Sequence, residues 1–135
     1  MSGELRLTLP NDLRELARVN ELAHAFLERH MLAPKTLYTT SLAIEEVLSN
    51  VIRHGYQDAD RHEISLCLRI DQGSVELLVE DDGREFDPSS APEVDLLAPL
   101  EERRAGGLGI HLLRTLTRGL RYERKDGRNH LRVRI

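Results

Sequence analysis

The chain has 135 residues, the usual length of one domain, and its hydrophobic fraction of 40% provides enough apolar side chains for one core. Charged residues make up 31% of the sequence, which argues against a disordered chain, and the net charge of -4 argues against a general nucleic-acid binder. A single cysteine, Cys67, excludes an internal disulfide, and no apolar run approaches the roughly 18 residues of a membrane span. We therefore expect a cytoplasmic protein that does not act in a membrane.

Charge is unevenly distributed along the second half of the chain. Between Glu80 and Glu102 the sequence is acidic with one basic residue, Arg84, whereas arginine dominates from Arg103 onward. Two solvated faces of opposite charge are the ordinary explanation. The other explanation is a patch that receives phosphate groups or an acidic partner.

The first part of the sequence predicts one strand followed by two helices. Leucines alternate with polar residues over 5–9, which is the pattern of a strand that ends at Pro10. Apolar residues then recur at helical spacing over 13–27, and an aspartate at position 12 suits the cap of that helix. A second helix is expected over 34–54, with a proline in its first turn and Gly55 at its end.

Two alternating strands are expected over 64–70 and 75–80, joined by a turn. Between 82 and 104 the periodicity vanishes, and this stretch holds three of the five prolines. A structureless loop of this length in a compact domain is usually functional. We expect a lid over 84–104.

The rest of the chain predicts a third helix, opened by a glycine cluster and running over 106–118, and two strands over 120–124 and 130–135. Asp126-Gly127 is a hairpin turn signal between these strands. Together the elements predict one domain over 1–135. Its fold class is α/β, a two-layer sandwich with a mixed, mostly antiparallel sheet and helices on one face.

A carboxylate and a carboxamide lie one turn apart on the second predicted helix. Glu46, Asn50 and His54 are four residues apart and form one row beside the apolar stripe. The amide oxygen of Asn50 can ligate a hard cation such as Mg²⁺, and the carboxylate of Glu46 can accept a proton. Such residues are also ordinary on a solvated helix face.

Two further clusters follow later in the chain. Asp81-Asp82-Gly83 comes directly after a strand, where the acid can accept a hydrogen bond from the exocyclic amine of adenine. Gly106, Gly107 and Gly109 open the third helix, where backbone N–H groups and the helix dipole favour phosphate oxygens. An acidic turn and a flexible hinge are the structural alternatives. The glycine cluster is not a P-loop, because no lysine follows it.

The order of these three clusters resembles that of the GHKL ATPase/kinase superfamily, which has the Bergerat ATP-binding fold. Within it, the chain is most similar to the bacterial anti-sigma-factor serine/threonine kinases. The similar segments read NVIRHGY over 50–56, DDGREFDP over 81–88 and GGLGIHL over 106–112. The resemblance covers nearly the whole chain.

The resemblance implies ATP and Mg²⁺ as cofactors and assigns roles by motif position. Asn50 is expected to hold Mg²⁺, Asp81 with Gly83 to bind adenine, and Glu46 to be the general base. The phosphate-side residues implied are Arg104, Gly106, Gly107, Leu108 and Gly109. One position departs from the family pattern, since Glu85 stands where a second glycine is common, which puts nucleotide affinity in doubt.

The resemblance also implies partners: a small STAS-type anti-sigma antagonist, a sigma factor and a second copy of the chain. The main hypothesis is a kinase that phosphorylates a serine or threonine of the STAS partner. The alternatives are an anti-sigma binding module gated by ATP without turnover, and the catalytic domain of a sensor histidine kinase. The chain ends after its last strand, which leaves no helix pair with a phospho-accepting histidine and disfavours the last alternative.

Overall fold

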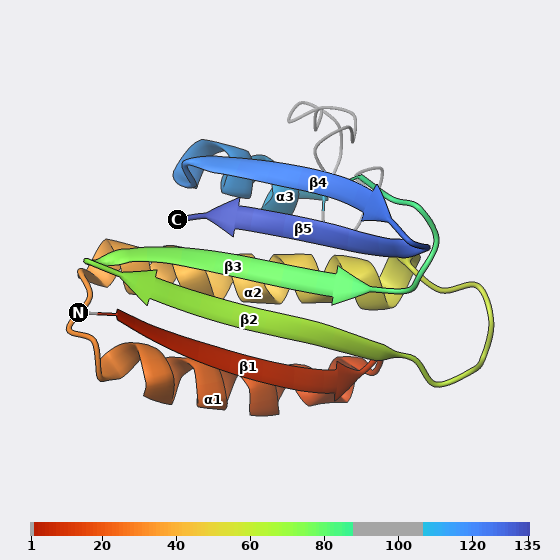
Figure 1. The fold of residues 1–135 in the computed structure, drawn as a ribbon, viewed down its shortest axis with the longest axis horizontal. Coiled ribbons are helices and arrows are strands. Elements are labelled where there is room, and N and C mark those ends of the chain that lie inside the picture. The colour runs from red at the N-terminus through yellow and green to blue at the C-terminus, as the bar shows by residue number, and fades with distance from the viewer. Residues whose placement is uncertain (1, 88–106) are drawn as a thin grey trace.

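The computed structural model describes residues 2–87 and 107–135, and its elements follow the predicted order (Figure 1). The elements are β1 (Ser2–Pro10), the 3-10 helix η1 (Leu13–Glu15), α1 (Leu16–Glu28), α2 (Pro34–His54), β2 (Glu63–Asp71), β3 (Ser74–Asp81), α3 (Gly107–Leu116), β4 (Gly119–Lys125) and β5 (Arg128–Arg134). Most of the predicted lid, from 88 to 104, lies outside the described residues.

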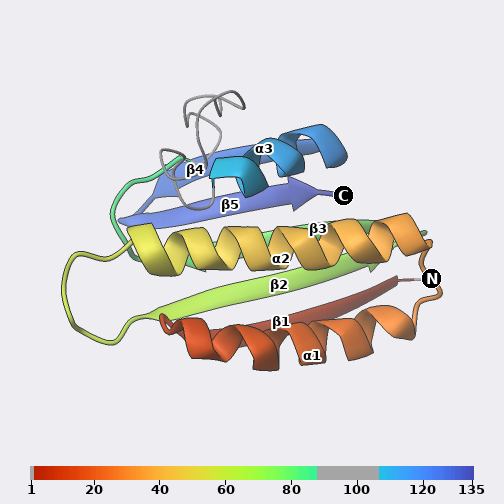
Figure 2. The same ribbon diagram turned by 180° about the vertical axis from the view of Figure 1, so that it is seen from behind.

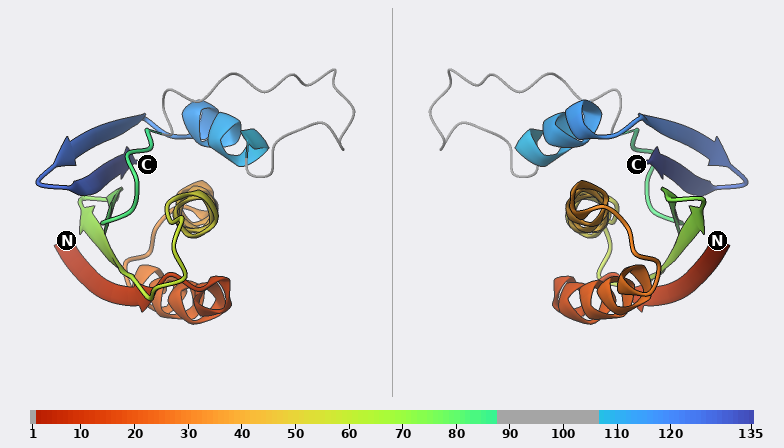
Figure 3. Two further views of the ribbon diagram at one scale, coloured as in Figure 1. Left: turned by 90° about the vertical axis from the view of Figure 1, so that its right-hand side faces the viewer. Right: turned by 90° about the vertical axis from the view of Figure 1, so that its left-hand side faces the viewer.

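The five strands form one sheet in the order β1-β2-β3-β5-β4. All four pairs are antiparallel, so the part of the sheet that the structure describes has no parallel pair, although a mixed sheet was expected. The three α-helices lie on one face of the sheet (Figure 2). Seen end-on, they fill the inside of its curve (Figure 3). The predicted two-layer α/β sandwich is confirmed.

The core forms where the apolar sides of the strands and helices meet. Alternate residues of β2 and β3 point inward, and Leu66, Leu68 and Leu77 are at most 1% exposed. They pack in one cluster with Ile44 and Leu48 from the apolar stripe of α2. Burying side chains of this size contributes about 1.5–3 kcal/mol each, so this cluster is the main source of stability. No helix of residues 2–87 and 107–135 is long and apolar enough to span a membrane.

Local chemistry explains where several elements begin and turn. The Asp12 Oδ1 atom accepts a hydrogen bond from the Arg14 backbone N at 2.9 Å and caps a 3-10 turn, so α1 begins four residues after the predicted cap. In the last hairpin, Asp126 and Gly127 have φ angles of 53° and 74°. Both values lie in the left-handed region that a two-residue hairpin turn requires, which confirms the turn predicted there.

The sheet topology brings four chain segments together at one end of the strands, on the right in Figure 1. There β3 and α2 end, β5 begins and β4 ends. The register pairs Asp81 of β3 with Asn129 of β5, and these residues continue the inward apolar rows of their strands. Both are buried, with exposed fractions of 4% and 6%. The fold therefore places two buried polar side chains where the strand pattern would otherwise place apolar ones.

Candidate nucleotide-binding site

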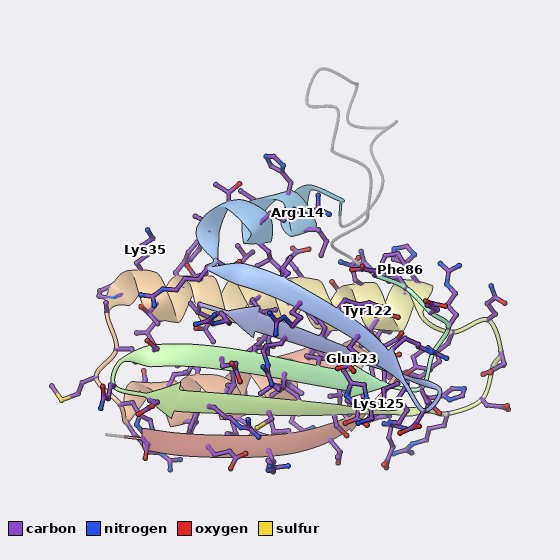
Figure 4. All side chains as sticks on the ribbon, turned by 45° about the horizontal axis from the view of Figure 1, so that its top comes forward. Lys35, Phe86, Arg114, Tyr122, Glu123 and Lys125 are labelled. Carbon is purple, nitrogen blue, oxygen red and sulfur yellow. The ribbon has the colours of Figure 1, made fainter. Side chains whose placement is uncertain are left out.

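A pocket lies at this end of the sheet, between the end of α2 and the inward face of β3, β4 and β5. Its polar and aromatic lining comprises Asn50, Asp81, Arg84, Phe86, Tyr122 and Asn129. Phe86 and Tyr122 are labelled in Figure 4, on the chain after β3 and on β4. The space left between the lining side chains is about 20 Å³, enough for about one water molecule. A purine base can enter only if lining side chains move apart.

Asp81 stands at the end of β3 with one carboxylate oxygen bonded internally. Its Oδ1 atom accepts hydrogen bonds from the Gly83 backbone N at 2.8 Å and from Asn129 Nδ2 at 3.0 Å. Among the described residues, no group donates a hydrogen bond to Oδ2. The carboxylate is therefore held in one orientation and keeps an acceptor oxygen for a ligand.

Gly83 allows the turn after β3 to dock directly on the end of α2. A Cβ atom at Gly83 would lie 2.5 Å from the backbone oxygen of Gly55. That oxygen accepts a hydrogen bond from the Arg84 backbone N at 2.8 Å, and the Arg84 Nε atom donates to the His54 oxygen at 2.6 Å. The C-terminal carbonyls of α2 are thus capped by the segment that follows Asp81. From the sequence, Gly83 is expected to lie beneath adenine. In the structure, the close contact with the Gly55 backbone requires a glycine at this position.

Asn50 is 6% exposed and faces the same pocket from α2. Its Nδ2 atom is buried without a hydrogen-bond partner among the described residues. Leaving a buried amide unpaired costs about 1–3 kcal/mol, so a carboxamide in this position favours a polar ligand. A half turn of the amide about its Cβ–Cγ bond would present the oxygen to the same place.

Glu46 lies one turn before Asn50 on α2, at the start of α3. A Cβ atom at Gly109 would overlap the Glu46 carboxylate, so the glycine lets the first turn of α3 approach it. Glu46 is half-buried, and this burial, together with the neighbouring charge of Glu45, raises its pKa above the ordinary value. The positive charge of Arg53 lowers the pKa of Glu46 and offsets part of this increase. A carboxylate with a raised pKa is a stronger proton acceptor while it remains ionised.

The structure thus brings Asn50, Asp81 and Gly83 together around the pocket and places Glu46 beside Gly109 along the same helix. Gly107 opens α3, as expected. Two predicted phosphate-side residues, Arg104 and Gly106, lie outside the described residues, as does the side chain of Leu108.

Sequence reasoning missed Asn129, Tyr122, Arg84 and Phe86 as lining residues. The signal for Asn129 was its strand phase, because it shares the inward side of the last strand with Leu131 and Val133. A polar residue in that phase is buried and needs partners. Arg84 and Phe86 lie inside the predicted lid, where no hydrophobic period predicts which side chains point inward.

His62, on the connection between α2 and β2, forms a second polar cluster beside the pocket. Its ring stacks on Tyr56 with centroids 4.5 Å apart. Its Nε2 atom lies 2.8 Å from Asp58 Oδ1, and its Nδ1 atom lies 3.2 Å from Asp82 Oδ1. The hydrogen bond to Asp58, with a further one to Asp82, raises the pKa of His62. The same contact lowers the pKa of Asp58.

We expect the His62 cluster to make stability depend on pH. Because the pKa of His62 is raised on folding, protonated His62 stabilises the fold fully below its unfolded pKa of about 6.5. This contribution is lost as pH rises through the higher folded pKa. NMR titration of His62 should show that raised pKa, and Asp58→Asn should reduce it, whereas the control Asp60→Asn should not. A pKa of His62 at or below 6.5 in the wild type would contradict this assignment.

Gly83→Ala tests the close contact between the turn after β3 and the Gly55 backbone. Its control measures the general effect on stability of replacing a glycine by alanine. The added methyl would push against the Gly55 carbonyl, so we expect the free energy of unfolding to fall by about 1–3 kcal/mol. Gly119→Ala is the matched control, since nothing lies within 4 Å of a Cβ at that position. It should change stability by less than about 1 kcal/mol. Urea unfolding of both variants gives the comparison, and equal losses would contradict the docking of the turn on α2.

The chain is similar in sequence to bacterial proteins that are named protein kinases. It is 34% identical over 94 residues to the serine/threonine-protein kinase BtrW of Bordetella bronchiseptica, covering 70% of this chain and 66% of that protein. It is 29% identical over 90 residues to the serine-protein kinase RsbW of Bacillus cereus, covering 64% of this chain and 56% of that protein. The match therefore spans under two thirds of the length of these relatives.

The fold is also found in a crystal structure of the RsbU and RsbW domains of Rv1364c from Mycobacterium tuberculosis. That structure has a TM-score of 0.65 and 17% sequence identity, covering 98% of this chain and 32% of the other. Finally, a family model described as the histidine kinase-like ATPase domain matches residues 9–135. The chain belongs to the histidine kinase-like ATPase domain family.

Proposed function

We propose that the chain is an ATP-dependent serine/threonine protein kinase and anti-sigma-type regulator that works in the cytoplasm on a small STAS-type partner. The observation that supports this most directly is Glu46, a half-buried carboxylate with a raised pKa at the start of α3. It lies one helical turn from Asn50 and its pocket. The family is one of ATPase domains, and the relatives BtrW and RsbW are named protein kinases.

The pocket suits the base of ATP. Apolar side chains of Val47, Val79 and Leu131 line it, and a flat base gains from leaving water against such a surface. The free Oδ2 atom of Asp81 is the acceptor for the exocyclic amine of adenine. Entry of the base requires the pocket to widen. Three lining residues lie outside the strands and helices, namely Gly55, Arg84 and Phe86, and of these Arg84 and Phe86 have side chains that can move.

Asn50 fits a magnesium ion through its carboxamide oxygen, because the Nδ2 atom has no partner among the described residues that would fix the amide with its oxygen turned away. Mg²⁺ held there would neutralise charge on the phosphate groups of ATP. The first turn of α3 begins at Gly107 and adds backbone N–H groups for the same charge. Among the described residues, no cluster of three or more acidic, histidine or cysteine side chains forms a metal site without ATP.

Glu46 then serves as the base of the transfer. The hydroxyl oxygen of the partner's serine or threonine forms a bond to the γ-phosphorus as the bond to the leaving ADP oxygen breaks. The hydroxyl proton passes to Glu46. Burial raises the pKa of this carboxyl and so strengthens it as a proton acceptor. Most of the remaining acceleration comes from positioning and charge neutralisation, as is general for phosphoryl transfer.

Glu46→Gln tests the base directly. The amide keeps the size of the side chain but removes its proton affinity, so ATP affinity should stay nearly unchanged. Phosphorylation of a STAS partner should fall by about 10²–10⁴-fold, the usual effect of a positioned base. A single-turnover assay with labelled ATP measures this. Glu21→Gln is the matched control, because Glu21 is an exposed glutamate on α1 and does not contribute to the pKa of Glu46.

Asn50→Ala should behave differently from Glu46→Gln in the same assay. It removes the proposed metal ligand, so ATP affinity and transfer should fall together. If Glu46→Gln transfers as fast as the wild type, Glu46 is not the base. If the wild type binds ATP but transfers nothing to any cognate STAS protein, an anti-sigma binding module gated by ATP is the better conclusion.

Asp81→Asn tests the recognition of adenine. The amide keeps an oxygen for the internal hydrogen bonds but loses a charged acceptor, so ATP binding should weaken by about 1–3 kcal/mol. The control Asp82→Asn changes an exposed neighbouring carboxylate and should leave ATP affinity within about twofold. Calorimetry with ATP and GTP measures both effects. Equal affinity of the wild type for the two nucleotides would contradict the role of Asp81.

A further inference from the structure

Three polar side chains form a row across the pocket end of the sheet. The strand register pairs Asp81 of β3 with Asn129 of β5, and Asn129 with Arg124 of β4. Residues paired in this way point to the same face of a sheet. The row therefore runs from the proposed adenine-binding carboxylate to the outer strand, with Asn129 in the middle.

Asn129 makes all four hydrogen bonds that a carboxamide can make. Its Nδ2 atom donates to Asp81 Oδ1 at 3.0 Å and to the Arg84 backbone oxygen at 2.8 Å. Its Oδ1 atom accepts from the Tyr122 hydroxyl at 2.5 Å and from Arg124 NH1 at 3.1 Å. A guanidinium can only donate, so turning the amide over would place N–H groups against N–H groups. Its orientation is thereby fixed.

This fixed amide holds the carboxylate plane of Asp81 in one orientation. Without Asn129, the Gly83 N–H would be the one described donor to the carboxylate, which could then rotate about its Cβ–Cγ bond and leave the second oxygen with no set direction. We propose that Asn129 is a positioning residue for base recognition: it engages Oδ1 of Asp81 and so aims Oδ2 at the exocyclic amine of adenine. This inference rests on the proposed nucleotide site and concerns its selectivity for the base.

The same network also holds the backbone after Asp81. Arg124 NH1 donates to the Gly83 oxygen at 2.7 Å, and Asn129 holds the Arg84 oxygen. The β4–β5 hairpin thus fixes both the carboxylate and the turn beneath it. A network in which every member is paired is rigid, and a rigid acceptor discriminates between donors and acceptors on a base.

The test compares binding of ATP with binding of ITP, which carries an oxygen in place of the 6-amino group. Calorimetry on the full chain with Mg²⁺ measures both affinities, and thermal unfolding checks that each variant folds. In Asn129→Ala, ATP affinity should fall about 10- to 100-fold, the effect of losing a hydrogen bond to a charged group. ITP affinity should change by less than about threefold, because it does not use the aimed oxygen.

Asn129→Asp sharpens the comparison. It keeps the shape of the side chain but replaces the donor to Asp81 with a second acceptor, so selectivity for ATP should fall at least as far as in Asn129→Ala. Arg128→Gln is the matched control, because Arg128 precedes Asn129 in β5 but pairs with Glu80 on the other face. It should leave both affinities unchanged.

A structural role alone would weaken ATP and ITP by the same factor in Asn129→Ala, and that result would overturn the inference. Tyr122→Phe covers the case in which Asn129 variants fail to fold, since it removes one donor to Asn129 and keeps the ring. It should lower ATP affinity about two- to fivefold without affecting ITP, and equal effects would again overturn the inference.

The wild type and Asp81→Asn distinguish this inference from the proposed function. If Asp81→Asn abolishes the preference for ATP over ITP while Asn129→Ala keeps it, Asp81 reads the base and only the role of Asn129 is wrong. If the wild type has no preference, both assignments fall.

Discussion

The backbone contact between Gly55 and the Gly83–Arg84 turn is the constraint on which the site depends. It joins the end of the longest helix to the end of the central strand, with the Arg84 N–H bonded to the Gly55 oxygen at 2.8 Å. Asn50 lies on the helix side of this junction and Asp81 on the strand side. A Cβ atom at Gly83 would push α2 and the end of β3 apart. The glycine at this position therefore helps to set the distance between the Asn50 amide and the Asp81 carboxylate.

Helix α2 connects the two halves of the proposed chemistry. Its last turns line the pocket through Asn50, and Glu46 meets the first turn of α3 beside Gly109. One rigid helix therefore sets the spacing between the base-binding end and the end where transfer would occur. Such rigidity favours reactions that depend on position, and phosphoryl transfer is one of these.

Most of the fold could be predicted from the sequence, because helices, strands and turns are encoded by the hydrophobic period and the turn residues of neighbouring positions. The second helix was predicted over 34–54 and is observed over that range. The site was harder to predict. Asp81 and Gly83 follow a strand in a recognisable motif, whereas Asn129 becomes important only when the register pairs it with Asp81 across 48 positions of the chain. Gly55 ends the helix without a left-handed φ, since the turn after β3 caps its carbonyls instead.

The nearly filled pocket has a consequence for every affinity measured on this protein. With about 20 Å³ of free space between the described lining side chains, a purine does not fit in the conformation described here, so binding is coupled to a widening of the pocket. The apparent dissociation constant equals the intrinsic one divided by the fraction of molecules in the widened form. A partner that favours the widened form would therefore tighten nucleotide binding without touching the nucleotide, and the nucleotide would by reciprocity tighten the partner.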